Sequence, residues 1–326
     1  MSPKGPAARN PGPDEPLTLL ILDRDAPAYA AALADLADDG MRLLSSTDPR
    51  DLPAGTAAAT IALGEPDRVA AALPELSALA WIQSTWAGVT PLADAATAGV
   101  TVTGVKGVFG GQMAEFVLAC LLDHVIGLAP RRRAQARREW WPAPTGSLAG
   151  KTLGVMGTGS IGVEVAARAA AFDLRLRGYS RSGAPREPFE SVFSADRLQE
   201  FLAGCDFVVG VLPDTPATRG LLDARALACL PRDALLVNVG RGTLLVDEDL
   251  VAALRAGRLA GAVLDVFRDE PLPAGHPFWD CPGLTVTAHV AARSWPRDIA
   301  ALFRDNLARF RAGEPLAHRF DPQQGY

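Results

Sequence analysis

The stretch VMGTGSIG at residues 155–162 is the most informative part of this chain, because its three glycines follow the pattern G-x-G-x-x-G. An apolar run, KTLGVMG at 151–157, leads into it, and an alanine-rich stretch at 162–172 follows. A short apolar run indicates a buried strand, and the alanine-rich stretch is typical of a helix. The order strand, glycine turn and helix therefore predicts the first unit of a parallel sheet that binds a dinucleotide.

The three glycines have different expected roles in this turn. Gly157 permits the tight change of direction, Gly159 lets the backbone approach a pyrophosphate, and Gly162 lets the helix pack closely on the strand. The helix that begins near Ser160 points its free N–H groups at the phosphates. The complete set of expected turn contacts is Gly157, Thr158, Gly159, Ser160, Ile161 and Gly162.

Five further apolar runs after this turn complete one domain. They lie at 174–180, 206–213, 233–240, 261–267 and 283–289. Helix-like stretches lie between them, so the six strands predict a parallel, doubly wound sheet with helices on both faces. We expect a Rossmann cofactor domain at 105–290, which contains a long helical segment at 112–128 near its start.

The first part of the chain shows the same alternation of apolar runs and helix-like stretches. The runs lie at 17–23, 41–46, 59–64, 79–85 and 100–104. A helical stretch at 296–312 follows the last strand of the cofactor domain, so the chain can return to the first domain at its end. We expect a flavodoxin-like substrate domain of residues 17–104 and 291–326, preceded by a proline-rich, disordered tail at 1–16.

Composition narrows the class of protein. The chain has 326 residues and a net charge of −5, with 48% hydrophobic and 21% charged residues, a balance typical of globular proteins with about two domains. The acidic balance argues against a dedicated nucleic-acid-binding protein. We find neither a run of about 20 apolar residues nor a signal-peptide pattern. The four cysteines are widely spaced, so we expect buried thiols in a reducing, cytoplasmic compartment, without a metal site or disulfides.

The residues after the second strand of the cofactor domain bear on the choice of dinucleotide. A carboxylate at this point usually accepts hydrogen bonds from the ribose hydroxyls of NAD. This chain has Ser180, Arg181 and Ser182 instead. Two hydroxyls and a guanidinium suit the 2′-phosphate of NADP, which a carboxylate would repel. NADP is therefore the preferred cofactor, and NAD is the alternative if Arg181 is only a solvated loop residue.

The chain resembles the D-isomer-specific 2-hydroxyacid dehydrogenase family, most closely its glyoxylate/hydroxypyruvate reductase A type. Besides the glycine turn, the blocks that carry the resemblance are WAGV at 86–89, VNVGRG at 237–242, AVLDVFRDEPLP at 262–273 and TAHVA at 287–291. The similarity extends over residues 81–311. It implies an oxidoreductase that reduces small 2-oxo acids to D-2-hydroxy acids with NAD(P)H.

The resemblance implies three catalytic residues, and the chemistry of each suits its role. Arg241 presents a planar fork of donors, which can grip the carboxylate and the carbonyl oxygen of a 2-oxo acid. His289 is the expected proton donor to the developing alkoxide, and Glu270 would hydrogen-bond its other ring nitrogen. All three follow the ends of expected strands, where open α/β sheets bind ligands.

The resemblance also implies contacts in both domains. In the WAGV block, backbone N–H groups would hold the substrate carboxylate, and the bulky Trp86 would exclude large substrates or would simply pack in the core. Asp265 would reach the nicotinamide carboxamide or, alternatively, cap a neighbouring loop. The expected substrate contacts are Trp86, Ala87, Gly88, Val89, Arg241 and His289. The further expected cofactor contacts are Leu212, Pro213, Val239, Gly240 and Asp265.

Partners and rival functions complete the expectations. Met113, Ala114 and Glu115 match a helix region that helps to build a dimer in the family, so a homodimer is expected, without nucleic-acid or membrane partners. The arginines between 131 and 138 are interpreted as a solvated helical face. One rival is a dinucleotide-sensing binding protein of the same fold without turnover. A methyltransferase would not explain the blocks after residue 237, and a serine hydrolase lacks its G-x-S-x-G motif here.

Overall fold

The computed structural model describes residues 17–321, so the tail expected at 1–16 lies outside the described residues. The chain divides into two compact units: one holds the described residues up to Val108 and from Ser294 onward, and the other is Phe109–Arg293. These boundaries lie a few residues beyond the expected 104 and 291. Residues 291–293 belong to the second unit, where the N–H of Arg293 donates to the Gln112 side chain at 3.0 Å.

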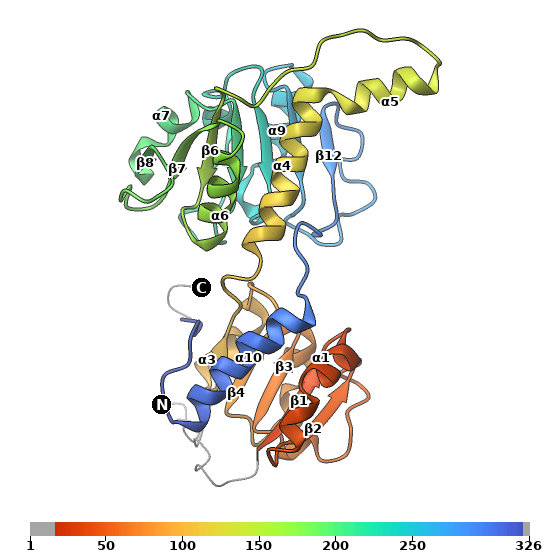
Figure 1. Cartoon of the computed structure of the whole chain (residues 1–326), viewed down its shortest axis with the longest axis vertical. Coiled ribbons are helices and arrows are strands. Elements are labelled where there is room, and N and C mark those ends of the chain that lie inside the picture. Colours follow the sequence, from red (N-terminus) through yellow and green to blue (C-terminus); the bar gives the residue numbers. More distant parts are fainter. Residues whose placement is uncertain (1–16, 322–326) are drawn as a thin grey trace. The chain divides into compact units, whose positions relative to one another are not determined.

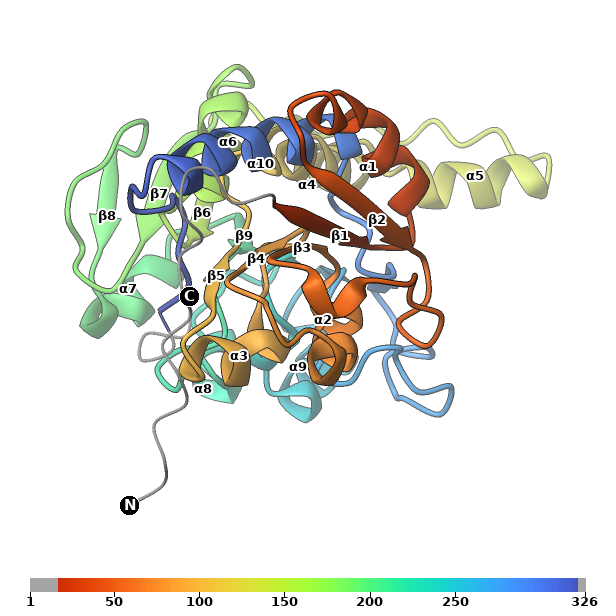
Figure 2. The same cartoon turned by 90° about the horizontal axis from the view of Figure 1, so that it is seen from below.

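The first unit is built on five parallel strands in the order β2-β1-β3-β4-β5. The strands are β1 (Thr18–Leu22), β2 (Arg42–Ser46), β3 (Ile61–Gly64), β4 (Trp81–Ser84) and β5 (Thr101–Thr103). Helices α1 (Ala26–Ala32) and α10 (Pro296–Arg311) lie on one face, and α2 (Pro66–Ala72) and α3 (Ala93–Thr97) lie on the other (Figure 2). This strand order is that of flavodoxin, which confirms the expected fold.

Helix α10 returns the end of the chain to this sheet. Its buried residues include Ile299, Phe303, Leu307 and Phe310, at intervals of three or four residues that place them on one face of the helix. The ring of Phe303 stacks on that of Trp81 with centroids 5.1 Å apart. Since Trp81 is the first residue of β4, this apolar face packs the returning helix against the sheet.

The second unit has seven parallel strands in the order β12-β11-β10-β9-β6-β7-β8. The strands are β6 (Thr152–Met156), β7 (Arg175–Tyr179), β8 (Ser191–Phe193), β9 (Phe207–Gly210), β10 (Leu235–Asn238), β11 (Gly261–Leu264) and β12 (Leu284–Val286). The order outward from β6 is that of a Rossmann sheet, as expected. The expectation of six strands was wrong: β8 is a three-residue edge strand with only Phe193 buried, too short to form an apolar run.

Helices cover both faces of the second sheet (Figures 1 and 2). Helices α4 (Gly110–Ile126) and α6 (Ser160–Ala170) pack together on one face. Helices α7 (Leu198–Leu202), α8 (Ala224–Leu227) and α9 (Asp247–Arg255) lie on the other. The two faces carry separate clusters of buried side chains, so the near-continuous apolar strands are explained by burial on both sides.

Helix α5 (Leu128–Ala136) continues from α4 after Gly127, which has a φ of +68° and ends the first helix. Its residues Arg132 and Arg133 are exposed, as expected for a solvated face, but Arg131 is half-buried and its guanidinium donates to the carbonyls of Ile126 and Ala143. Within residues 17–321, no single helix is long and apolar enough to cross a membrane. The pair α4 and α5 meets that test by length and composition, but it bends by 58° and α4 packs in the core of its unit.

Candidate active site

The glycine turn joins β6 to α6, and its geometry fits a dinucleotide pyrophosphate. Gly157 has a φ of +117°, a conformation that residues with side chains rarely adopt. A Cβ on Gly162 would lie 1.8 Å from the Gly157 carbonyl oxygen, so only glycine lets the helix approach the turn. A Cβ on Gly159 would meet nothing within 4 Å, which leaves open space before the helix N-terminus. The other turn residues are Thr158 and Ile161, both half-buried, and the exposed Ser160.

Three polar residues follow β7, the strand next to β6. The Ser180 hydroxyl accepts a hydrogen bond from the Gly183 N–H at 3.1 Å, and the Ser182 hydroxyl accepts one from the Ala184 N–H at 3.3 Å. Each hydroxyl keeps its own proton to donate. The Arg181 side chain is exposed. This turn therefore offers donors and one cation at the carboxyl end of the sheet.

The segments after β9 and β10 lie against each other. Leu212 is half-buried, Pro213 is exposed, and Val239 and Gly240 are buried. A Cβ on Gly240 would lie 3.0 Å from the Leu212 carbonyl oxygen, so glycine allows the two backbones to come this close. The four expected contacts therefore belong to adjoining segments at the carboxyl end of the sheet.

Arg241 is held by a buried amide that the sequence analysis did not single out. The Asn238 side chain donates to the Arg241 carbonyl at 2.9 Å and accepts from the Gly240 N–H at 3.2 Å. The Arg241 guanidinium is half-buried and donates to the Gly240 carbonyl at 2.7 Å. Burial lowers the pKa of Arg241, whereas the charges of Glu270 and Asp214 raise it. An arginine stays charged in such a place.

His289 and Glu270 form a hydrogen-bonded pair. Nδ1 of His289 lies 2.7 Å from Oε2 of Glu270, and Oε1 of Glu270 accepts from the Phe267 N–H at 2.8 Å. Burial acts to raise the pKa of Glu270, but the hydrogen bonds from His289 and Phe267 and the charge of Arg241 outweigh it and leave that pKa below its ordinary value. Because the carboxylate occupies Nδ1, Nε2 is the ring nitrogen left to exchange a proton.

Asp265 caps the loop that carries His289, which is the alternative that the sequence left open. Its carboxylate is buried and accepts hydrogen bonds from the Thr287 hydroxyl at 2.6 Å and from the N–H groups of Val290 and Ala291 at 2.9 Å each. The His289 N–H donates to the Asp265 carbonyl at 2.8 Å. His289 itself has a φ of 54°, which is unusual for a residue other than glycine.

The three expected catalytic residues lie at the carboxyl ends of neighbouring strands in one sheet. Arg241, Glu270 and His289 follow β10, β11 and β12, which are neighbours in the sheet. The charges of Arg241 and Glu270 act on each other. The backbones that carry them touch, because a Cβ on Gly242 would lie 2.0 Å from the Phe267 carbonyl carbon. A guanidinium, a carboxylate and an imidazole are thus brought together although they are far apart in the sequence.

The WAGV block follows β4 in the first unit. The Ser84 hydroxyl accepts from the Trp86 N–H at 2.9 Å and donates to its carbonyl at 2.8 Å. The Thr85 hydroxyl donates to Asp23 at 2.8 Å. Trp86 and Gly88 are half-buried, Ala87 is exposed and Val89 packs in the core. The block is therefore fixed at its start by two hydroxyls that the sequence analysis did not single out.

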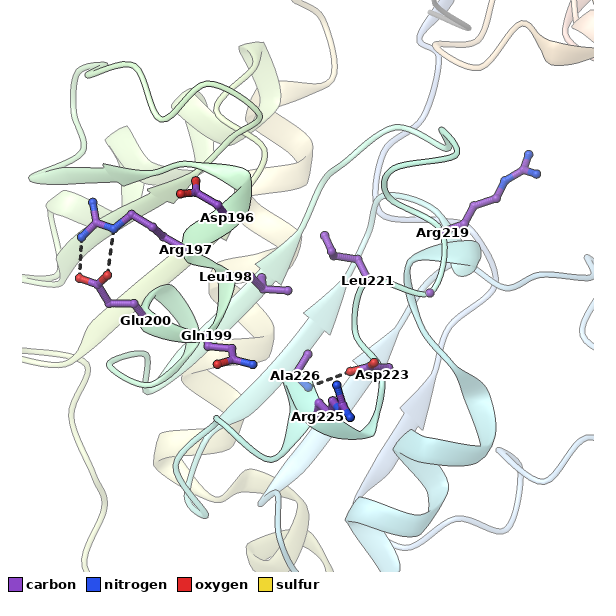
Figure 3. Close-up of a pocket in the computed structure, with 11 residues that line it drawn as sticks. Asp196, Arg197, Leu198, Gln199, Glu200, Arg219, Leu221, Asp223, Arg225 and Ala226 are labelled. Atoms are coloured by element: carbon purple, nitrogen blue, oxygen red, sulfur yellow. Dashed lines mark hydrogen bonds and ion pairs between the residues drawn. The ribbon is translucent and has the colours of Figure 1, made fainter.

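A pocket of about 710 Å³ opens on the second unit between α7 and residues 219–226 (Figure 3). Its lining is charged, and Arg197 pairs there with Glu200 at 2.5 Å. It lies close to the turn after β7, because Ser194, which precedes the pocket residues, pairs with Ser182. The described residues that line it include none of the three expected catalytic residues.

Comparisons with known proteins place the chain in a family. Residues 118–291 match the family model for the NAD binding domain of D-isomer specific 2-hydroxyacid dehydrogenases. A glyoxylate/hydroxypyruvate reductase A from Serratia proteamaculans is 36% identical over 66% of this chain and 69% of its own length.

Solved structures agree with this match. A D-isomer specific 2-hydroxyacid dehydrogenase family protein from Aeromonas salmonicida is 39% identical with a TM-score of 0.90, covering 94% of this chain and 100% of its own. A dehydrogenase from Xanthobacter autotrophicus, in complex with NADPH and MES, is 33% identical with a TM-score of 0.85, covering 96% and 100%. An NADPH-dependent glyoxylate/hydroxypyruvate reductase from Sinorhizobium meliloti, in complex with NADP and sulfate, is 30% identical with a TM-score of 0.81, covering 95% and 100%. This chain belongs to the D-isomer-specific 2-hydroxyacid dehydrogenases and is an NAD(P)-dependent oxidoreductase with a Rossmann domain.

Proposed function

We propose that this chain reduces small 2-oxo acids, of the size of glyoxylate and hydroxypyruvate, to D-2-hydroxy acids with NADPH. The observation that carries the proposal is the 2.7 Å contact of His289 Nδ1 with Glu270 Oε2, beside the half-buried Arg241. A guanidinium matches a 2-oxo acid, which presents a carboxylate next to a carbonyl oxygen. The names of the relatives from Serratia and Sinorhizobium support the same substrate class.

Each of the three residues has one role in this proposal. Arg241 holds the substrate carboxylate and polarises the carbonyl, and its partial burial strengthens both interactions. His289 donates a proton from Nε2 to the carbonyl oxygen as that oxygen gains negative charge. Glu270 fixes the ring through Nδ1 and so keeps Nε2 directed for the transfer. NADPH, when bound, supplies the hydride that reduces the carbonyl carbon.

The preference for NADPH rests on the turn after β7. We assign the 2′-phosphate to Arg181 with the hydroxyls of Ser180 and Ser182, because this turn supplies a cation and donors at the position where NAD enzymes carry a carboxylate. The Xanthobacter and Sinorhizobium relatives hold NADPH and NADP, which supports the same choice. The remaining assigned cofactor contacts are the glycine turn at 157–162 and Leu212, Pro213, Val239 and Gly240, whereas the carboxylate of Asp265, first expected to reach the nicotinamide, is taken up by the loop of His289.

The WAGV block is assigned to the substrate carboxylate on the family resemblance. Gly88 leaves the backbone N–H groups of residues 87–89 accessible, since it has no side chain to block them. Trp86 would then limit the size of the substrate. The hydroxyls of Ser84 and Thr85 fix the start of the block through hydrogen bonds to the Trp86 backbone and to Asp23, which supports a binding role for it.

The test is an assay of NADPH absorbance with glyoxylate, hydroxypyruvate, pyruvate and bulkier 2-oxo acids, with NADH run in parallel. We expect turnover of the small acids that falls as the side chain grows. His289→Ala is the control, and its turnover should fall by roughly 10²–10⁴ while NADPH affinity stays close to that of the wild type. An absence of turnover by the wild type with every acid, despite tight NADPH binding, would favour the rival dinucleotide sensor.

A homodimer in the cytoplasm completes the proposal. The resemblance at Met113, Ala114 and Glu115, which lie in α4, supports the dimer. Trp140 and Trp141 after α5 are 93% and 42% exposed, and such exposed indoles often mark a contact between proteins. Light scattering on the purified chain measures the assembly, and Trp140→Ala should weaken it.

A further inference from the structure

Glu270 lies in the long loop between β11 and β12, so its position depends on what holds that loop. Within the loop, the Phe267 N–H binds one carboxylate oxygen of Glu270. That contact fixes the side chain relative to its own loop but not the loop relative to the sheet. A carboxylate on a loop that moves by about 1 Å would no longer orient a histidine well, and such misplacement is costly in catalysis.

Asp247, the first residue of α9, contacts this loop at two points on opposite sides of Glu270. Its Oδ1 lies 3.6 Å from Nε of Arg268, and its Oδ2 lies 3.5 Å from Nε2 of His276. The Arg268 guanidinium also donates to the Leu245 carbonyl, just before α9. The side chain of Asp247 is only 15% exposed, so its carboxylate acts where water screens poorly.

The histidine in this cluster is oriented for the contact. Nδ1 of His276 accepts a hydrogen bond from the Phe278 N–H at 3.4 Å, and the two rings pack with centroids 4.4 Å apart. A nitrogen that accepts from an N–H carries no proton of its own, so the neutral ring carries its proton on Nε2, which faces Asp247. Asp247 therefore attracts His276 in both its neutral and its charged form.

We propose that Asp247 is a positioning residue for the pair of Glu270 and His289: by binding Arg268 and His276, it tethers both sides of the loop that carries Glu270 to the start of α9. The proposal rests on the proposed function, because it assigns Asp247 an effect on turnover that passes through Glu270. Neither the sequence motif nor the family resemblance assigns this residue a role.

The experiment is a double-mutant cycle measured by NADPH oxidation with glyoxylate. Asp247→Asn should lower kcat by about tenfold in the wild-type background and by less than twofold in a Glu270→Gln background, since the tether then has no carboxylate to position. Equal losses in the two backgrounds would show that Asp247 acts on the fold in general and would overturn the proposal. Kd for NADPH should stay unchanged in both.

Glu248→Gln is the matched control, because it removes the same charge from the same first turn of α9, where Glu248 follows Asp247. It should leave kcat within twofold of the wild type. Hydrogen exchange of the amides at 266–280 gives a readout without turnover: Asp247→Asn should speed it and Glu248→Gln should not. If the wild type reduces no 2-oxo acid, both the proposed function and the effect of Asp247 on turnover are refuted. If Asp247→Asn leaves hydrogen exchange at 266–280 unchanged, only the proposal that Asp247 holds the loop is refuted.

Discussion

Gly159 and Gly162 lie in the same turn, yet alanine should have different effects at the two positions. At Gly159 it should weaken NADPH binding, and at Gly162 it should lower the stability of the fold. At Gly159 a Cβ would meet nothing within 4 Å, and the backbone angles, φ −74° and ψ −169°, are open to alanine. The free energy of unfolding should therefore change by less than about 1 kcal/mol. The methyl group occupies the space assigned to the pyrophosphate. Losing one hydrogen bond to a charged phosphate costs about 1.5–3 kcal/mol, which is roughly a 10- to 100-fold rise in Kd for NADPH.

Gly162→Ala is the contrasting variant. Its Cβ would lie 1.8 Å from the Gly157 carbonyl oxygen and 3.0 Å from the carbonyl carbon, so the helix must move away from the strand. Overpacking of this kind costs about 1–3 kcal/mol of stability without any cofactor present. Urea unfolding and NADPH fluorescence titration measure the two quantities separately. A Gly159→Ala protein of normal stability that binds NADPH as tightly as the wild type would refute the assignment of the turn to the pyrophosphate.

Three further predictions concern the remaining site residues. Arg241→Lys should lower kcat/KM for glyoxylate by about tenfold to a hundredfold, because a point charge cannot form two parallel hydrogen bonds; equal efficiency in steady-state assays would contradict the grip. Ser180→Asp with Arg181→Ala should shift the ratio of kcat/KM values from NADPH toward NADH, and a wild type that already favours NADH would refute the assignment of the 2′-phosphate to this turn. Because the folded-state pKa of Glu270 lies below its ordinary 4.5, its charged form is retained above that pH and is lost only as the pH falls through the lowered value. The pH profile of kcat/KM should therefore show no ionisation of Glu270 above pH 4.5. If kcat/KM fell between pH 6 and 5, and Glu270→Gln removed that fall, the hydrogen-bonded pair of His289 and Glu270 would be contradicted.

Most of the fold could be predicted from the sequence because parallel strands covered on both faces are continuous apolar runs. The runs at 17–23 and 151–157 became β1 and β6 with their ends shifted by only one residue. The alternation of strands and helices predicted parallel sheets with helices on both faces, as both sheets are. The edge strand β8 was missed because its three residues, SVF, are too few to form a recognisable apolar run.

The sequence pointed to the residues that we propose to react, but not to those that support them. Arg241, Glu270 and His289 stand in motifs, and the structure places them at one edge of one sheet. Asn238 could have been suspected, since an amide at the end of a buried apolar strand needs partners. Asp247 could not, because a carboxylate in the first turn of a helix is common for reasons of capping and dipole alone. Its contacts depend on the path of a loop whose course has no sequence pattern.

Asp265 shows how support and reaction are linked in this fold. A positive φ at a residue such as His289 costs of order 1–3 kcal/mol and persists only where the surroundings enforce it. The buried Asp265 supplies that enforcement, because its carboxylate accepts the N–H groups of Val290 and Ala291 and its carbonyl accepts that of His289. Hydrogen bonds to a charged group contribute about 1.5–3 kcal/mol each, enough to offset the strain. The direction of the histidine is therefore set by Asp265 through the backbone and by Glu270 through the ring, and losing either contact should impair the proposed proton transfer without removing the imidazole.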